Sequence, residues 1–219
     1  MIKEIELKYT LKDRKQAEEI WEDPVLYAAC NLETRESVCM SAIYFDTRDS
    51  ILARSGMSLR IRREGEHSVL SIKNKGITEN GLHRRDENNM PYTGEVDENT
   101  VFRPDRDMLA ESELGSRLLK LIDDRDLYPV IHMNYLRRRF RMDSGDSFVE
   151  VAIDTGEIST ETASIPVCEL EIELYSGDVD DMIAFGNRLA DRYGIEREDI
   201  TKYARGLELL EKQLCMTNK

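Results

Sequence analysis

The sequence contains little of the material from which zinc sites and disulfide scaffolds are built. Its three histidines do not cluster along the chain, and its four cysteines show no metal-ligand spacing. The cysteines are Cys30, Cys39, Cys168 and Cys215. A chain of 219 residues can bury a stable hydrophobic core without the help of disulfide bonds. We therefore expect reduced, structural cysteines and no zinc centre.

Long apolar runs and an excess of basic residues are also missing. No stretch approaches the roughly 18 apolar residues of a membrane span, and the opening MIKEIEL has no apolar signal-peptide core. Lys and Arg number 31 against 44 Asp and Glu, which gives a net charge of -13. A nucleic-acid backbone is therefore not an expected partner, and neither is a membrane. We predict a cytoplasmic protein.

The pattern of elements predicts an α+β fold in a single domain that spans residues 1–219. Strand-like alternation dominates, with many strands expected to be antiparallel. Asp13 is positioned to cap a first short helix, which Pro24 stops. Residues 97–127 lack period-two alternation and predict a helical insertion that covers the outside of a sheet. Residues 178–215 predict C-terminal helices.

One feature recurs in nearly every predicted strand: charged side chains alternate with apolar ones. In the first strand Glu4, Glu6 and Lys8 alternate with apolar residues, so one face of the strand is charged. Later strands repeat this pattern with charged residues at period two. These residues are Arg60, Arg62, Lys73, Lys75, Arg85, Glu87, Arg137, Arg139, Glu150, Asp154, Glu169, Glu171 and Glu173.

A sheet with one solvated face explains any single strand of this kind. It explains the whole set less well, because several strands are nearly pure acid or pure base. Glu169, Glu171 and Glu173 would stand about 7 Å apart in successive pairs and repel unless a cation or a basic strand lies opposite. A sheet closed on itself meets that need. Oxygen ligands without Cys or His suit Mg²⁺ or Mn²⁺, and arginines and lysines suit phosphates.

The ordered series of motifs resembles the CYTH superfamily, also called the triphosphate tunnel metalloenzymes. Glu4-Ile5-Glu6-Leu7-Lys8 matches its E-x-E-x-K signature, and the likeness extends over nearly the whole chain. The further matching segments are Tyr44-Phe45-Asp46-Thr47, Leu59-Arg60-Ile61-Arg62, Ile72-Lys73-Asn74-Lys75-Gly76, Arg85-Asp86-Glu87, Asp154-Thr155-Gly156, Glu169-Leu170-Glu171-Ile172-Glu173-Leu174 and Lys202-Tyr203-Ala204-Arg205-Gly206-Leu207.

The resemblance implies an eight-stranded antiparallel closed β-tunnel with helices packed outside, whose lumen binds a triphosphate and divalent metal. It implies metal ligands at Glu4, Glu6, Asp154, Glu169, Glu171 and Glu173. It implies phosphate-binding residues at Lys8, Arg60, Arg62, Lys73, Lys75, Arg85, Arg137, Arg139 and Lys202. Lys8, Glu4, Glu6 and Glu171 would carry the catalysis, with Mg²⁺ or Mn²⁺ as cofactor.

Among members of this family the chain looks most like the bacterial inorganic triphosphatases, without the helical CHAD domain that often follows their tunnel. We therefore expect hydrolysis of inorganic triphosphate to pyrophosphate and phosphate. The alternatives are a class IV adenylate cyclase, a thiamine or nucleoside triphosphatase, and a non-catalytic module that binds polyphosphate. A closed barrel leaves no free strand edge, so a homodimer would use helices or loops.

Two local assignments stay open in the sequence. In LRRRFR the arginines Arg137, Arg138, Arg139 and Arg141 leave the register open, because a shift of one residue would exchange the side chains that face inward. Asp46 is either a site residue or the cap of the turn that follows it.

Overall fold

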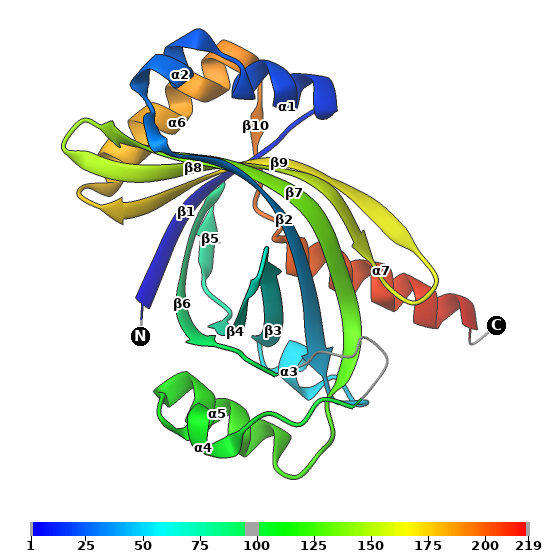
Figure 1. Ribbon diagram of the computed structural model, residues 1–219. Helices are drawn as coiled ribbons and strands as arrows, with labels where there is room; N and C mark the ends of the chain where they lie inside the picture. Colours follow the sequence, from blue (N-terminus) through cyan, green and yellow to red (C-terminus); the bar gives the residue numbers. More distant parts are fainter. Residues whose placement is uncertain (1, 95–100, 218–219) are drawn as a thin grey trace.

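The computed structural model describes residues 2–94 and 101–217, and its centre is a closed antiparallel barrel (Figure 1). Eight strands form the barrel, in the order β1-β9-β8-β7-β2-β3-β4-β6, and pairing of β1 with β6 closes it. The strands are β1 (Ile2–Thr10), β2 (Asn31–Asp46), β3 (Met57–Glu64), β4 (His67–Asn74), β6 (Leu82–Pro91), β7 (Tyr128–Ser144), β8 (Ser147–Ser159) and β9 (Ser164–Ser176). The predicted closed eight-stranded tunnel is confirmed.

Two short strands and one helix were not predicted from the sequence. β5 (Ile77–Glu79) pairs with β6, and β10 (Glu196–Arg197) pairs with the end of β1. α2 (Pro24–Ala29) begins at the proline that was expected only to end the preceding helix. Proline fits the first turn of a helix because its missing N–H has no partner there, and the Asp23 carboxylate accepts from Val25 N and Leu26 N.

Helices cover the two ends and one side of the barrel (Figure 1). α1 (Arg14–Trp21), capped by Asp13 as expected, lies with α2 and α6 (Val179–Tyr193) at one end. Their apolar faces join β1, β8 and β9 in one hydrophobic cluster that includes Ile20, Phe185 and Leu189. Burial of such side chains is the main source of stability, and it leaves the other face of each strand free for charge.

The segment between β6 and β7 contains two helices at the opposite end of the barrel (Figure 1). These are α4 (Arg106–Ala110) and α5 (Glu113–Ile122). α5 buries Leu114, Leu118 and Ile122 in a second hydrophobic cluster that also contains side chains of β3 and β4. Residues 97–100 of the expected insertion lie outside the described residues, and the single-domain interpretation stays a prediction.

α3 (Ile51–Arg54) and α7 (Lys202–Thr217) flank the lumen. The Asp46 carboxylate accepts hydrogen bonds from the backbone N–H groups of Thr47, Leu52 and Ala53, so Asp46 holds the start of α3. Tyr203 of α7 stacks on Tyr44 of β2 with ring centroids 4.8 Å apart. Tyr44 and Asp46, at the end of β2, therefore position α7 and α3 beside the lumen.

The arginine-rich part of β7 has a defined register. Arg137 pairs with Asp154 and Arg139 with Ala152 of β8, and both arginine side chains line the central cavity. Arg138 points to the other face, where its guanidinium lies 2.7 Å from the Glu18 carboxylate of α1. The inward set is thus Arg137 and Arg139, the one used in the prediction.

Candidate active site

The charged faces of the strands surround one cavity of about 680 Å³ inside the barrel. All nine cationic residues that the sequence nominated for phosphate binding line it. They are Lys8, Arg60, Arg62, Lys73, Lys75, Arg85, Arg137, Arg139 and Lys202. Strands from all around the barrel contribute, because the period-two alternation turns the same side of each strand inward.

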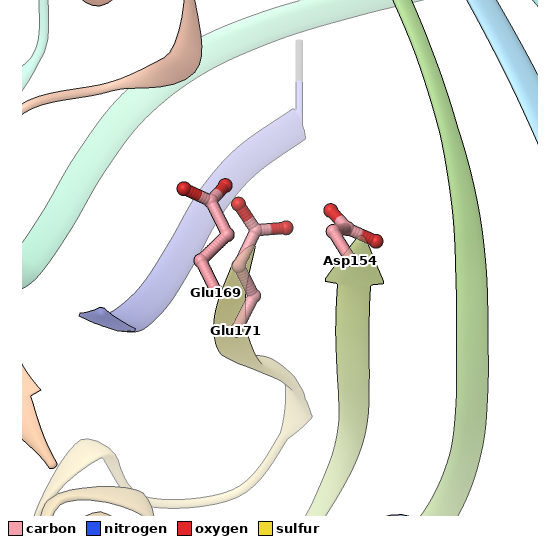
Figure 2. Close-up of side chains that lie close together, drawn as sticks. All are labelled: Asp154, Glu169 and Glu171. Carbon is pink, nitrogen blue, oxygen red and sulfur yellow. The ribbon is translucent and has the colours of Figure 1, made fainter. Parts of the chain in front are cut away.

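Three carboxylates form a compact group at the wall of this cavity, here called the acidic triad: Asp154, Glu169 and Glu171 (Figure 2). Asp154 lies on β8, and Glu169 and Glu171 lie on the neighbouring β9. Each offers one oxygen, and these atoms lie within 4.8 Å of one another. Glu171 lines the cavity, whereas the side chains of Asp154 and Glu169 are 0% and 1% exposed and lie beneath its surface.

Four cationic side chains surround the acidic triad. Lys202 Nζ lies 2.7 Å from Asp154 and 2.8 Å from Glu171, and it also contacts Glu169. Arg137 Nη2 lies 2.7 Å from Asp154 and 2.6 Å from Glu171. Lys8 and Arg205 each reach Glu169, at 3.0 and 2.9 Å. Positive and negative groups are therefore interleaved, and the repulsion expected among the acids of β9 is offset from neighbouring elements.

These contacts determine the ionisation of the triad. Burial disfavours the charged form of Asp154, yet the positive charges of Arg137 and Lys202 outweigh burial and lower its pKa. The pKa of Glu171 is likewise held well below its usual range, because Lys202, Arg137 and Lys8 overcome the cost of burial. Burial alone would lower the pKa of Lys202, but the three carboxylates raise it well above its ordinary value. Asp154 and Glu171 are therefore anionic at neutral pH.

A second acidic group crosses three adjacent strands and is here called the carboxylate row: Glu6, Glu173 and Glu150. Glu6 of β1 pairs with Glu173 of β9, which pairs in turn with Glu150 of β8. Arg85 Nη2 lies 2.9 Å from Glu6, and Arg141 Nε lies 3.0 Å from Glu150. Glu173 has no ion pair within the described part of the chain.

The crowding of acids in the carboxylate row disfavours ionisation of Glu6 and Glu173. Burial, together with the charges of Glu171 and Glu4, raises the pKa of Glu6 to about 7 even though Arg85 opposes the shift. Burial and the neighbouring charges of Glu4, Glu6 and Glu150 raise the pKa of Glu173 to about 8. Like charges directly opposite each other on paired strands destabilise one another. An added cation would relieve this repulsion.

Glu4 lies beside the carboxylate row, but unlike Glu173 it is in contact with positively charged side chains. Lys73 Nζ is 2.9 Å from Glu4 and 3.1 Å from Glu87, and Arg85 also contacts Glu4. Burial works against ionisation of Glu4, but Lys73 and Arg85 prevail and lower its pKa. Glu87 is therefore a partner of the lumen cations Lys73 and Arg60.

The remaining candidate cations differ in how they are held. Arg60 is buried and its guanidinium lies 3.6 Å from Glu87, while Arg62 Nη2 lies 2.6 Å from Glu64. Arg139 lies between Glu36, at 2.7 Å, and the more distant Glu64 and Glu150. Lys75 is exposed at the edge of the cavity. Most of these cations are thus pre-positioned by carboxylates around the lumen.

The donor chemistry of the lumen fits a hard divalent cation. Every acidic side chain in both groups offers oxygen, and the three oxygens of the acidic triad are spaced closely enough to share one ion. Mg²⁺ and Mn²⁺ favour such all-oxygen sites, and Mg²⁺ usually takes only one or two carboxylates together with substrate phosphates. Glu171, Glu4, Glu6 and Glu173 line the cavity and are the accessible candidates.

Arg205, which contacts the acidic triad, and His83, which lines the cavity, were absent from the sequence-based site list. Arg205 lies one helical turn after Lys202 on α7 and reaches the same triad, and that spacing was the available signal. His83 precedes Arg85 by two residues on β6, so strand alternation places both on the lumen side. His83 is 2% exposed, and burial together with nearby Lys8 and Arg85 lowers its pKa.

The sequence and the fold were compared with those of known proteins. The chain is 29% identical over 214 residues to the inorganic triphosphatase of Haemophilus influenzae, covering 97% of this chain and 56% of that protein. The chain thus spans little more than half the length of that relative. Among solved structures, HpAC1 from Hippeastrum, described as having a dominant triphosphatase activity, superposes with a TM-score of 0.67 at 17% identity. That likeness covers 94% of this chain and 95% of the other.

The PH1819 protein from Pyrococcus horikoshii OT3 gives a TM-score of 0.57 at 17% identity, with 94% of this chain and 98% of that chain covered. Similarity at this level of identity establishes the fold. Among the described residues no helix is both long and apolar enough to cross a membrane. The family model of the CYTH domain matches residues 2–207, nearly the whole sequence. The chain therefore belongs to the CYTH domain family.

Proposed function

We propose that the lumen binds a triphosphate together with a divalent cation and hydrolyses a terminal phosphoanhydride bond. The observation that carries this proposal is the single cavity in which nine candidate phosphate-binding cations meet accessible carboxylates. A module that only binds anions gains nothing from acids in its own site, because those acids repel its ligand. The all-oxygen donor set supports Mg²⁺ or Mn²⁺ as the cofactor.

The cationic side chains bind and orient the phosphates. Arginines such as Arg60 and Arg137 offer planar guanidinium groups that fit two phosphate oxygens at once, and lysines such as Lys8, Lys73 and Lys202 act as compact charges. Charge is spread over the non-bridging oxygens in phosphoryl transfer, so fixed cations around the chain stabilise the transition state. They need little reorganisation because carboxylates already hold them in place.

The acidic residues hold the cation and manage the proton of the attacking water. Glu4, Glu6, Glu171 and Glu173 reach the cavity, and Asp154 and Glu169 support them from beneath. When bound, a divalent cation supplies Lewis-acid polarisation of phosphate oxygens and lowers the pKa of water. Glu6 lines the cavity, and its carboxylate can accept a proton from a water molecule there.

Inorganic triphosphate is the proposed substrate, with pyrophosphate and phosphate as products. The curated relative from Haemophilus influenzae is named for this activity. The aromatic side chains around the lumen give little support to a nucleoside or thiamine group. Tyr44 and Tyr135 are 5% and 7% exposed, Tyr203 is stacked on Tyr44, and Arg141 lies over the ring of Tyr175 at 4.5 Å. These rings are already occupied by protein groups.

The test is a ranking of substrates. Phosphate release is measured from inorganic triphosphate, ATP and thiamine triphosphate with Mg²⁺ or Mn²⁺, and the ATP sample is examined for cyclic AMP. We expect the highest kcat/KM on inorganic triphosphate and no cyclic AMP. Preference for ATP with formation of cyclic AMP would instead establish a cyclase. Tight binding of polyphosphate without turnover of any substrate would favour the non-catalytic module.

A further inference from the structure

Lys202 is the cation most deeply engaged with the acidic triad, and its position depends on the segment before it. It is the first residue of α7 and is 9% exposed. Residues 198–201 connect β10 to α7 and carry Lys202 to the lumen. Glu198 N donates to Lys8 O at 2.9 Å, and the Asp199 carboxylate accepts from Gly81 N. This connector is therefore tied to β1 by a backbone hydrogen bond and to the β5–β6 turn by the Asp199 side chain.

His83 is the buried lumen side chain that reaches the connector from β6. Its Nε2 lies 2.9 Å from the carbonyl oxygen of Glu198. Because a carbonyl oxygen only accepts, Nε2 must carry the proton and donate. Nδ1 lies 3.0 Å from Thr78 Oγ1 of β5. The imidazole is thus held from both sides, and its orientation is determined by Thr78 and Glu198 together.

Hydrogen bonds and the short chain segment 198–201 together lead from β5 to the acidic triad. Thr78 contacts His83, His83 donates to Glu198, and the Thr201 hydroxyl accepts from Ala204 N at 3.1 Å to cap the first turn of α7. Lys202 follows directly and reaches Glu171 at 2.8 Å. Among the described residues, no hydrogen bond or ion pair of His83 reaches the triad itself.

We propose that His83 is a positioning residue for Lys202: by holding the Glu198 carbonyl it fixes the start of α7, so that the ammonium group meets the acidic triad and the bound phosphate. The proposal rests on the proposed function for the role of the phosphate. Partners of this kind, which do not touch the ligand, commonly affect affinity or rate by about 10- to 100-fold when removed. A displacement of about 1 Å at a reacting group has a similar effect.

The test compares variants that remove or keep the donor. His83→Leu removes the N–H, His83→Gln keeps an amide N–H, and Thr78→Val removes the partner of Nδ1 without much change in size. Lys202→Met removes the ammonium group. His132→Leu, on the opposite face of β7 from the cavity-lining Met133, is the matched control. Each variant is assayed for kcat/KM on inorganic triphosphate and, in EDTA, for binding of inorganic triphosphate by calorimetry.

We expect His83→Leu to lower kcat/KM by about tenfold or more and to weaken metal-free binding of triphosphate. His83→Gln should recover most of that loss, Thr78→Val should cause a smaller loss, and His132→Leu should cause none. The decisive result is non-additivity. In the Lys202→Met background, His83→Leu should cause almost no further loss of kcat/KM or of triphosphate binding, because its effect acts through Lys202. If His83→Leu fails to fold, the same cycle with Thr78→Val replaces it.

Two results would overturn the proposal. Fully additive losses of His83→Leu and Lys202→Met would show that His83 acts independently of Lys202. Equal losses in the Gln and Leu variants would show that the N–H donor is irrelevant. A wild-type protein that binds triphosphate but releases no phosphate would defeat the proposed function alone, because the calorimetric cycle still tests His83.

Discussion

The acidic triad and the carboxylate row lie in the same barrel, yet they are balanced differently. Four cations contact the three carboxylates of the triad, and the pKa values of Asp154 and Glu171 are lowered. In the row, Glu6 and Glu173 face each other across two strands and their pKa values are raised. In the triad the balancing cations are already in place, whereas in the row an added cation would lower the raised pKa values of Glu6 and Glu173.

The difference follows from which elements supply the cations. α7 and β7 bring Lys202, Arg205 and Arg137 to the triad, and β1 brings Lys8. Among the described residues, no lysine or arginine side chain reaches Glu173. The cost of burying a carboxylate falls steeply when a positive group lies within about 4 Å. Glu171 and Glu173, two residues apart on β9, therefore have pKa values shifted in opposite directions.

The largest expected effect comes from breaking the triad at its accessible member. Glu171→Gln keeps the size of the side chain but removes a charge that contacts Lys202 and Arg137 and faces the cavity. Metal-dependent phosphate release should fall by about 10²- to 10³-fold with the fold retained. Steady-state kinetics measures the rate of phosphate release, and circular dichroism measures whether the fold is retained.

Glu157→Gln is the matched control, because Glu157 is exposed on β8, the strand that also carries Asp154. Its activity should equal that of the wild type. A Glu171→Gln variant that keeps its rate but no longer needs metal would contradict the assignment of Glu171.

A smaller effect is expected from removing a cation outside the triad. Lys73→Ala deletes an ammonium group that lies 2.9 Å from Glu4 and 3.1 Å from Glu87 and lines the cavity. Loss of one charged hydrogen-bonding group should raise KM for inorganic triphosphate by about tenfold and change kcat less.

Lys15→Ala controls for a change in net charge, since Lys15 lies on the surface of α1 in an exposed pair with Glu19. An unchanged KM in Lys73→Ala would remove Lys73 from the phosphate-binding set. A fall in kcat at constant KM would instead give it a role in the transition state alone.

The last prediction concerns the pH dependence of stability, where a change in activity is not expected to be the main effect. Burial and neighbouring carboxylates raise the pKa of Glu173 from 4.5 to about 8, so the folded state binds more protons than the unfolded state between these values. Its contribution to the free energy of unfolding is therefore present at low pH and is lost as pH rises toward 8. In EDTA, Glu173→Gln should flatten this decline by up to about 1.4 kcal/mol per pH unit.

Denaturant unfolding of both proteins at several pH values measures the slope. Mg²⁺ or Mn²⁺ should flatten the wild-type curve as well, because a bound cation favours the ionised form. Parallel curves for wild type and variant in EDTA would show that Glu173 titrates normally and that the row is not under electrostatic strain.

The residue pattern predicted the inward faces of the strands, and the resemblance to the CYTH superfamily implied the closed eight-stranded barrel. Alternation along each strand predicts which side chains face inward, and acids on β9 without neighbours of opposite charge predict closure onto basic strands. The short elements α2, β5 and β10 were not predicted, because segments of two to six residues are too short to show a periodic pattern of apolar residues. Their existence depends on contacts with the completed barrel.

The candidate site was predictable in composition but not in its electrostatics. Alternation nominated Glu171 and Glu173 equally, yet only register determines that Lys202 and Arg137 contact the first while Glu6 faces the second. His83 shares the period of Arg85, but its role depends on the Glu198 carbonyl, which lies 115 residues away in sequence. Such relations arise from tertiary structure and leave no local signal.

The central claim is that the lumen hydrolyses a triphosphate with the help of a divalent cation. The most direct measurement is release of phosphate and pyrophosphate from inorganic triphosphate by the wild-type protein, with Mg²⁺ or Mn²⁺ and with EDTA. We predict rapid release of one phosphate and one pyrophosphate per substrate with metal, and none in EDTA. Absence of release with either metal, or an equal rate in EDTA, would contradict the account.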